Sequence, residues 1–178
     1  MYAGEGEPLL HTDLPEIIHH TRKSGIDISI TTNAVPMTER WLQSALKDIT
    51  WIKVSINAGT PATYAKIHQT KKDDFYKVVS NLETAIQIRA QKKLGCTIGS
   101  QMVLLPENKY EATNLAKQMK SIGCDYLVVK PYSQHKKSIT RTYENIDYEN
   151  YLDLKAELEG LNSTDFSVVF REETIQKL

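Results

Sequence analysis

The chain has 178 residues, enough for one domain with a sizeable core, and its 22 basic and 22 acidic residues give a net charge of zero. This balance excludes an overall field that would recruit nucleic acid or an anionic membrane, so a charged partner must be met locally. With no long apolar run, no signal peptide and two cysteines, the sequence predicts a reduced, cytoplasmic single domain over residues 1–178.

The first stretch, Gly4-Glu5-Gly6-Glu7-Pro8, has two glycines within three residues and follows a short strand-like start. The glycines allow a backbone to approach a ligand closely, Glu7 adds a carboxylate there, and Pro8 ends strand pairing. The same composition also fits an ordinary turn from a strand to a helix. Local chemistry leaves both interpretations open.

Strand-like and helix-like patterns alternate along the rest of the chain. A helix is expected to begin at Asp13, with Glu16 three residues on, and to end at Gly25. Its expected apolar stripe consists of Leu14, Ile17, Ile18 and Thr21. The elements expected after it are a strand over 26–33, a helix over 38–47, a strand over 51–57, a short helix over 62–67, a long helix ending near Gly95, a strand over 97–105, a helix ending at Gly123, a strand over 125–131, a helix over 147–161 and a strand over 166–171. Such alternation requires parallel pairing through right-handed crossovers, so the fold class is α/β.

The polarity of the strand faces decides the architecture, because parallel strands covered by helices on both sides are nearly continuous apolar runs. Here Ile52 and Val54 alternate with Lys53 and Ser55, and the other strands alternate in the same way. Helices must cover the apolar faces, so the polar faces are expected to converge on an interior that is solvated or filled by a polar ligand. This favours a partial (β/α)6-type, open TIM-like barrel of parallel strands over a closed apolar barrel. An open sheet with one wet face is the alternative.

Ligands of parallel α/β folds bind at the carboxyl ends of the strands. The polar residues at those ends are Thr31, Thr32, Asn33, Ser55, Asn57, Gln101, Lys130 and Tyr132.

On these residues the chain resembles the radical S-adenosylmethionine (radical SAM) superfamily. Gly4-Glu5-Gly6-Glu7-Pro8 is similar to the family's Gly-Gly-Glu-Pro motif at the end of its second strand, with Glu5 in place of one glycine. Residues 30–33 and 54–59 resemble the ends of its third and fourth strands. The resemblance implies that the first motif holds the methionyl amino group of S-adenosylmethionine and that the later strand ends meet its carboxylate and ribose. The implied cofactor-binding residues are Gly6, Glu7, Thr31, Thr32, Asn33, Ser55 and Asn57.

The chain departs from the family at the cluster. Members bind a four-iron four-sulfur cluster through Cys-x-x-x-Cys-x-x-Cys after the first strand, whereas this chain begins within the second strand and its Cys96 and Cys124 lie far apart. We therefore expect an N-terminally truncated barrel without the first strand and the cluster loop, with a natural cluster-free relative as the alternative. Residues 174–178 look like the opening of a further element.

The resemblance also implies the chemistry of a full-length parent. There, S-adenosylmethionine and the cluster would give a 5'-deoxyadenosyl radical that removes a hydrogen atom from the substrate. The chain alone is expected to hold no stoichiometric cofactor and to be inactive.

A basic loop follows the fourth expected strand. Residues 130–141 contain Lys130, His135, Lys136, Lys137 and Arg141 and no acid. The loop is either simply solvated or lies over the cavity and meets an anionic group of an unknown small-molecule or peptide substrate. The expected substrate-binding residues are Gln101, Lys130, Tyr132 and His135.

Two other functions stay open. One is an ordinary α/β-barrel lyase or aldolase with Lys53 or Lys130 as its nucleophile, and the other is a cluster-free binding or scaffold domain. The sequence shows no zinc or catalytic-triad pattern. Without a strand before it, the segment 2–4 would form an exposed edge, which predicts pairing of two copies into a homodimer.

Overall fold

The computed structural model describes residues 1–3, 6–135 and 137–171. The features expected at Gly4, Glu5, Lys136 and residues 174–178 lie outside this part of the chain.

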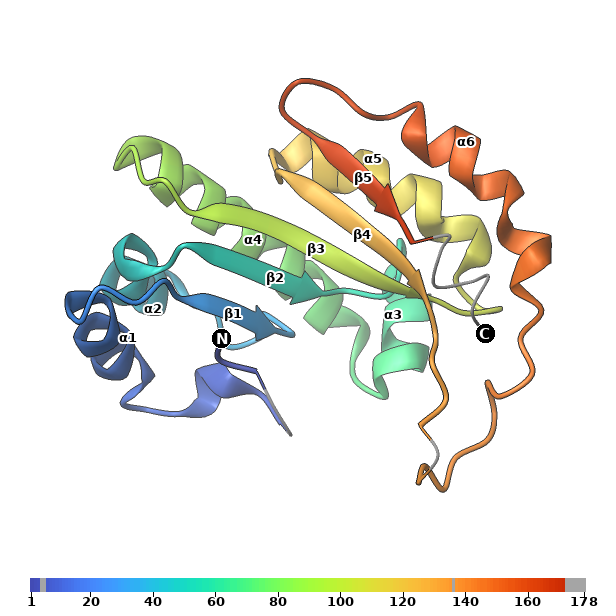
Figure 1. The fold of residues 1–178 in the computed structure, drawn as a ribbon, viewed down its shortest axis with the longest axis horizontal. Helices are drawn as coiled ribbons and strands as arrows, with labels where there is room; N and C mark the ends of the chain where they lie inside the picture. The colour runs from blue at the N-terminus through green and yellow to red at the C-terminus, as the bar shows by residue number, and fades with distance from the viewer. Residues whose placement is uncertain (4–5, 136, 172–178) are drawn as a thin grey trace.

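The described strands form one five-stranded parallel sheet whose order follows the sequence (Figure 1). They are β1 (Ser29–Thr32), β2 (Trp51–Ser55), β3 (Thr97–Leu104), β4 (Tyr126–Pro131) and β5 (Ser167–Phe170). Tyr2 extends the sheet by a parallel bridge to Ile30, with its backbone N–H donating to Ser29 O at 2.7 Å. The α/β class and the parallel pairing are as the sequence predicts.

A helix stands in every crossover between successive strands. The α-helices are α1 (Leu14–Lys23), α2 (Glu39–Ala45), α3 (Pro61–His68), α4 (Lys72–Gln91), α5 (Ala112–Ile122) and α6 (Asp153–Glu159), and the 3-10 turns are η1 (Pro8–Leu10), η2 (Leu46–Asp48), η3 (Lys109–Glu111) and η4 (Tyr148–Tyr151). Thr38 and Thr60 begin α2 and α3 by accepting backbone N–H groups with their side chains, and Gly123, at φ 89°, ends α5.

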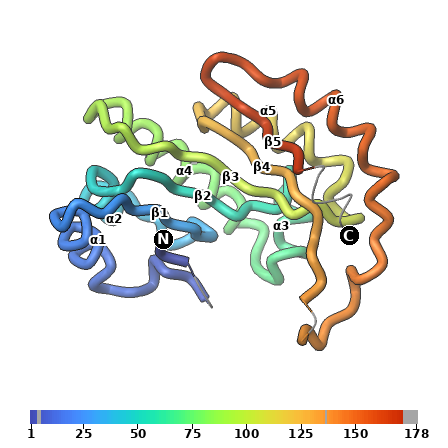
Figure 2. Tube along the Cα trace, viewed as in Figure 1, coloured from blue at the N-terminus to red at the C-terminus, as the bar shows by residue number. Residues whose placement is uncertain are grey.

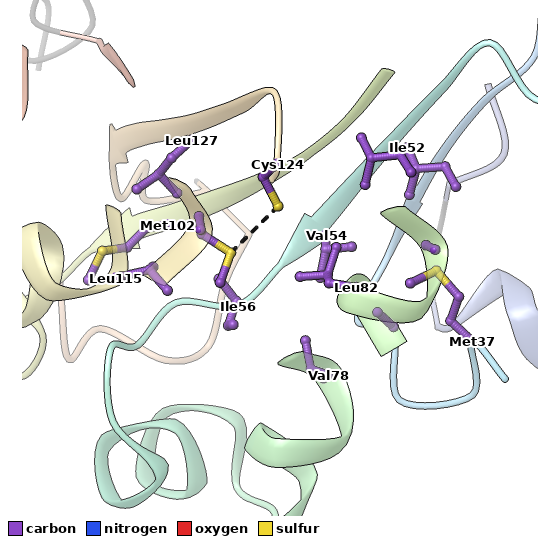
Figure 3. Close-up of a cluster of buried hydrophobic side chains, with 14 of the residues drawn as sticks. Met37, Ile52, Val54, Ile56, Val78, Leu82, Met102, Leu115, Cys124 and Leu127 are labelled. Carbon is purple, nitrogen blue, oxygen red and sulfur yellow. Dashed lines mark hydrogen bonds between the residues drawn. The ribbon is translucent and has the colours of Figure 1, made fainter. Parts of the chain in front are cut away.

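The core lies on one side of the sheet only. Helices α4 and α5 run behind the strands in Figures 1 and 2, and among the residues that the structure describes no helix lies on the opposite face of β2, β3 and β4. Figure 3 shows Ile52 and Val54 of β2 beside Val78 and Leu82 of α4, and all four side chains are fully buried. The alternation of apolar and polar residues therefore separates a covered face from an open one.

Strand β1 is shorter than the sequence predicts. It begins at Ser29 because Ser29 pairs with Trp51, the first residue of β2, so the residues before it have no strand beside them. Thr50 and Trp51 instead both donate their backbone N–H groups to Ile28 O. Ile26 is consequently left 57% exposed.

Two helices also differ from expectation. Asp13 makes no capping hydrogen bond with its side chain, and Ile17 is 38% exposed, so it is not part of the core. The helix expected over 147–161 is divided into η4 and α6. Tyr148 and Tyr151 are both buried, and a spacing of three residues places both on one side of a 3-10 turn.

Within the described residues, no helix has the length and apolar character needed to cross a membrane.

Candidate functional site

Polar side chains lie toward the carboxyl ends of β1, β2 and β3 on the open face; those of Thr31 and Ser55 are partly exposed and that of Gln101 is buried. Thr31 of β1 is paired with Lys53 of β2, and Ser55, the last residue of β2, with Gln101 of β3. The hydroxyls of Thr31 and Ser55 and the amide of Gln101 make no hydrogen bond with any other described residue. These groups are free to bind a polar ligand.

Glu7 holds the end of β1. Its Oε1 accepts hydrogen bonds from Thr32 Oγ1 at 2.6 Å and Leu9 N at 3.1 Å, and its Oε2 accepts from Asn33 N at 2.7 Å. Thr32 is 3% exposed and accepts in turn from Ala34 N at 2.8 Å, where the backbone has a φ of 60°. Glu7 and Thr32 thus fix the turn after β1. The sequence analysis had identified these two residues only as candidate ligands.

Gly6 precedes this anchor in an open position. Its φ is 110°, which favours glycine, and a Cβ built on it would meet nothing within 4 Å. The backbone at Gly6 therefore borders free space beside the strand ends.

Asn57 holds the end of β2 in a similar way. It adopts a φ of 48°, its Oδ1 accepts from Val103 N at 2.7 Å, and its carbonyl accepts from Asn108 Nδ2 at 2.8 Å. Asn108 is fully buried and also donates to Val103 O at 2.8 Å. The amide oxygen of Asn57 is therefore committed to β3, and its amide nitrogen is the group left for a ligand.

Glu111 also holds the chain just after β2, a role that the sequence analysis did not predict. Its carboxylate accepts four hydrogen bonds, from Gly59 N at 2.8 Å, Thr60 N at 3.0 Å, Thr60 Oγ1 at 2.8 Å and Thr63 Oγ1 at 2.6 Å. A Cβ on Gly59 would approach Glu111 O to 2.7 Å, so glycine allows this close contact. About 50 residues separate Glu111 from its partners, and no local pattern signals the contact.

The predicted substrate residues divide into two groups. Gln101 and Lys130 lie on the open face, where Gln101 is 9% exposed. Tyr132 lies in the loop after β4, with its N–H donating to Tyr148 Oη at 2.7 Å, and His135 is exposed further along. The structure brings the first two residues near the strand ends and leaves the side chain of His135 in solvent.

The basic loop is partly neutralised. Arg141 pairs with Glu144 at 2.6 Å, and His135 Nδ1 accepts from the backbone N–H of Lys137 at 3.2 Å. Lys53 and Lys130, in contrast, are residues of β2 and β4. Burial lowers the pKa of both side chains, and the positive charge of Arg171 lowers both further.

A family model described as the Radical SAM superfamily matches residues 1–119. The chain belongs to this superfamily. In full-length members, the family implies S-adenosylmethionine and an iron–sulfur cluster as cofactors.

Curated relatives carry the name Probable GTP 3',8-cyclase. The protein of Methanococcus maripaludis (strain S2) is 41% identical over 86 residues, which cover 47% of this chain and 28% of that protein. The protein of Metallosphaera sedula is 34% identical over 126 residues, 68% of this chain and 37% of that protein. The matches thus cover less than two fifths of the length of these relatives.

Solved radical SAM structures share the fold. Streptococcus suis SuiB superimposes with a TM-score of 0.71 over 93% of this chain and 37% of that chain, at 14% identity. An archaeal TYW1 gives 0.61 over 90% and 49%, at 16% identity. These likenesses confirm the predicted open, TIM-barrel-like α/β architecture.

The described residues do not fit the cluster. Burial raises the pKa of the Cys96 and Cys124 thiols to about 12, so both stay protonated, whereas a cluster ligand is a thiolate. In the part of the chain that the structure describes, no group of three or more His, Cys, Asp or Glu side chains is placed to hold a metal ion. S-adenosylmethionine, in contrast, suits the free polar groups at the strand ends.

Proposed function

We propose that this chain is the part of a radical SAM enzyme that binds S-adenosylmethionine at the ends of β1 and β2 and orients a substrate over β3 and β4. The observation that carries the proposal is that the polar side chains at the strand ends fall into two sets, one that holds the backbone and one that is free to bind a ligand. Glu7 and Glu111 use their carboxylates to hold the backbone, while Thr31, Ser55 and Gln101 keep free polar groups on the open face.

Each part of the ligand would meet a different kind of group. The open backbone at Gly6 allows close approach of the methionyl end. The hydroxyls of Thr31 and Ser55 donate hydrogen bonds to its carboxylate or to the ribose oxygens. Because the strand ends are held by buried hydrogen bonds, these donors are in position before the ligand arrives.

The identity of the substrate of the whole enzyme is a second, more specific proposal. The relatives' name supports a purine nucleotide as the first substrate to test, with Lys130 and Gln101 as the residues that face it. The chain by itself is proposed to be inactive, because its described residues do not fit the cluster. A lyase remains the second candidate on the strength of Lys53, and reductive trapping of an aldehyde on that lysine would support it.

Titration of the isotopically labelled chain with S-adenosylmethionine, followed by NMR, tests the proposal without requiring turnover. Saturable shifts are expected at Gly6, Thr31 and Ser55. Ser55→Ala is expected to weaken the affinity about tenfold, since a hydrogen bond to a charged group contributes about 1.5–3 kcal/mol.

Ser80→Ala is the matched control, because Ser80 is exposed on α4, behind the covered face. The control is expected to bind as the wild type does. Shifts confined to the helices, or equal affinities for Ser55→Ala and the wild type, would contradict the proposed site.

A further inference from the structure

Three cations share the open face of the sheet. Lys53 lies in the middle of β2, paired with Gly99, and Lys130 lies near the end of β4, paired with Val103. Arg171 follows β5 directly, and its N–H donates to Val129 O at 2.9 Å. Val169 pairs with Val128 on the open face, so two residues later Arg171 lies on that face beside Lys130.

These charges lack a protein counter-charge in the described residues. None of the three residues takes part in an ion pair there. The positive charges of Lys130 and Arg171 lower the pKa of Lys53, which places the three groups within electrostatic reach of one another. Like charges gathered on a partly buried surface are unfavourable unless an anion joins them.

The stacked rings of Trp51 and Tyr126, here called the aromatic floor, lie beside the three cationic side chains. Trp51 and Tyr126, the first residues of β2 and β4, stack with ring centroids 6.1 Å apart and planes 7° from parallel. Gly99 lies beneath them, and a Cβ there would come within 2.3 Å of the Tyr126 ring. Lys53 Nζ is 5.3 Å from the centre of the Trp51 ring. The stacked rings lie at the amino ends of β2 and β4, and the free polar groups of the open face lie on their carboxyl side.

Between the two lysines, strand β3 supplies a neutral hydrogen-bond donor, the side-chain amide of Gln101. Gln101 of β3 is paired with Ser55 on one side and Val128 on the other, which places it between Lys53 and Lys130 along the sheet. Its amide makes no hydrogen bond with any other residue that the structure describes. Val128 is 9% exposed and adds an apolar wall.

We propose that Lys53, Lys130 and Arg171, with the Gln101 amide, bind an anionic group of the substrate, a phosphate or a carboxylate. This inference rests on the proposed function for the identity of the ligand as substrate, because the three cationic side chains lie on the same open face as the proposed S-adenosylmethionine site. The anion site itself is defined without reference to that cofactor.

Isothermal titration of the chain with inorganic pyrophosphate and, separately, with citrate tests the site and distinguishes the two anion sources. One pyrophosphate or one citrate per chain is expected to bind. Lys53→Met and Lys130→Met each remove a charge and keep an unbranched side chain, and each is expected to weaken the preferred anion about tenfold or more. Lys117→Met, on the exposed side of α5, is the matched control and is expected to leave binding unchanged.

Circular dichroism of each variant establishes that it is folded. Should a lysine variant fail to fold, Arg171→Gln provides the same test at the edge of the sheet. Equal anion binding by the wild type and all variants would overturn the proposal, as would no saturable binding by the wild type.

The titration with S-adenosylmethionine separates this inference from the proposed function. If the wild type binds S-adenosylmethionine but no anion, the anion site is wrong and the proposed function stands. If it binds pyrophosphate through the lysines and S-adenosylmethionine not at all, the proposed function is wrong and the anion site stands.

Discussion

The two faces of the sheet are built from the same strands and have opposite roles. In β2, Ile52 and Val54 are fully buried against helices, while Lys53 and Ser55 alternate with them on the open face and are only partly covered. The covered face lowers the free energy of the fold by removing apolar surface from water. The open face gathers like charges and free polar groups, which do not stabilise the empty protein. Substitutions on the two faces should therefore affect different measurements.

Leu82→Ala is the most severe test of the covered face. Leu82 is fully buried in α4 beside Val54 (Figure 3), and truncation would leave a cavity between helix and sheet. We expect the free energy of unfolding to fall by about 2–5 kcal/mol, measured by urea denaturation. Ser55→Ala, on the other face, should change it by less than about 0.5 kcal/mol. Similar losses in both variants would remove the distinction between the faces.

Glu111→Gln tests the hydrogen bonds by which Glu111 of η3 holds the loop after β2. A carboxylate accepts all four hydrogen bonds from Gly59, Thr60 and Thr63, whereas an amide offers one acceptor oxygen and turns two N–H groups toward donors. We expect a loss of about 1–3 kcal/mol in the free energy of unfolding.

The exposed Glu83 of α4 provides the control for this substitution. Glu83→Gln should leave stability unchanged. In Glu111→Gln, S-adenosylmethionine binding should weaken together with stability, since the loop after β2 loses its support. Unaltered stability and binding would show that the four contacts are dispensable.

The sequence predicted what depends on local pattern. The alternation of strand-like and helix-like segments predicted the parallel strands, and the alternation of apolar and polar residues within β2 predicted the two faces. The order of the motifs indicated the family. It could not show that Thr32 and Asn57 turn their side chains to the backbone, because a threonine or asparagine at a strand end can serve either as a ligand or as a cap.

Long-range partners were also beyond the sequence. The contacts of Glu111 join η3 to the loop after β2 and to α3, and the position of Arg171 beside Lys130 follows from the register of β4 and β5. A single sequence specifies neither before the fold is known. The aromatic floor was missed for the same reason, since Gly99 signals a close approach without naming Tyr126 as the group that approaches.

The two cysteines test how tightly the covered side is packed. Burial raises the pKa of Cys96 and Cys124 to about 12, so the folded chain keeps both protons at a pH where the unfolded chain loses them. This contribution to stability is complete below about pH 9 and should be lost as the pH rises toward about 12.

Denaturation between pH 8 and 11 would measure this loss, and the double variant Cys96→Ala, Cys124→Ala should show a shallower decline. In the native chain, a thiol reagent at pH 8 should react slowly and only after unfolding. Rapid labelling of both thiols, or about four irons per chain after anaerobic treatment with iron and sulfide, would contradict the buried, protonated state.

The smallest expected effect has the opposite sign and lies on the open face. Lys53→Met removes one of three neighbouring positive charges while its unbranched side chain still covers Trp51. Relief of repulsion should raise the free energy of unfolding of the empty chain by about 0.5 kcal/mol, a small value because water screens these partly exposed groups. The gain should shrink in about 1 M salt, where the screening length is about 3 Å. It should also disappear in saturating pyrophosphate, since an anion bound by Lys53 stabilises the wild type more than the variant. A stability loss in low salt would instead make Lys53 a structural residue, and the two faces of the sheet would then differ in composition but not in role.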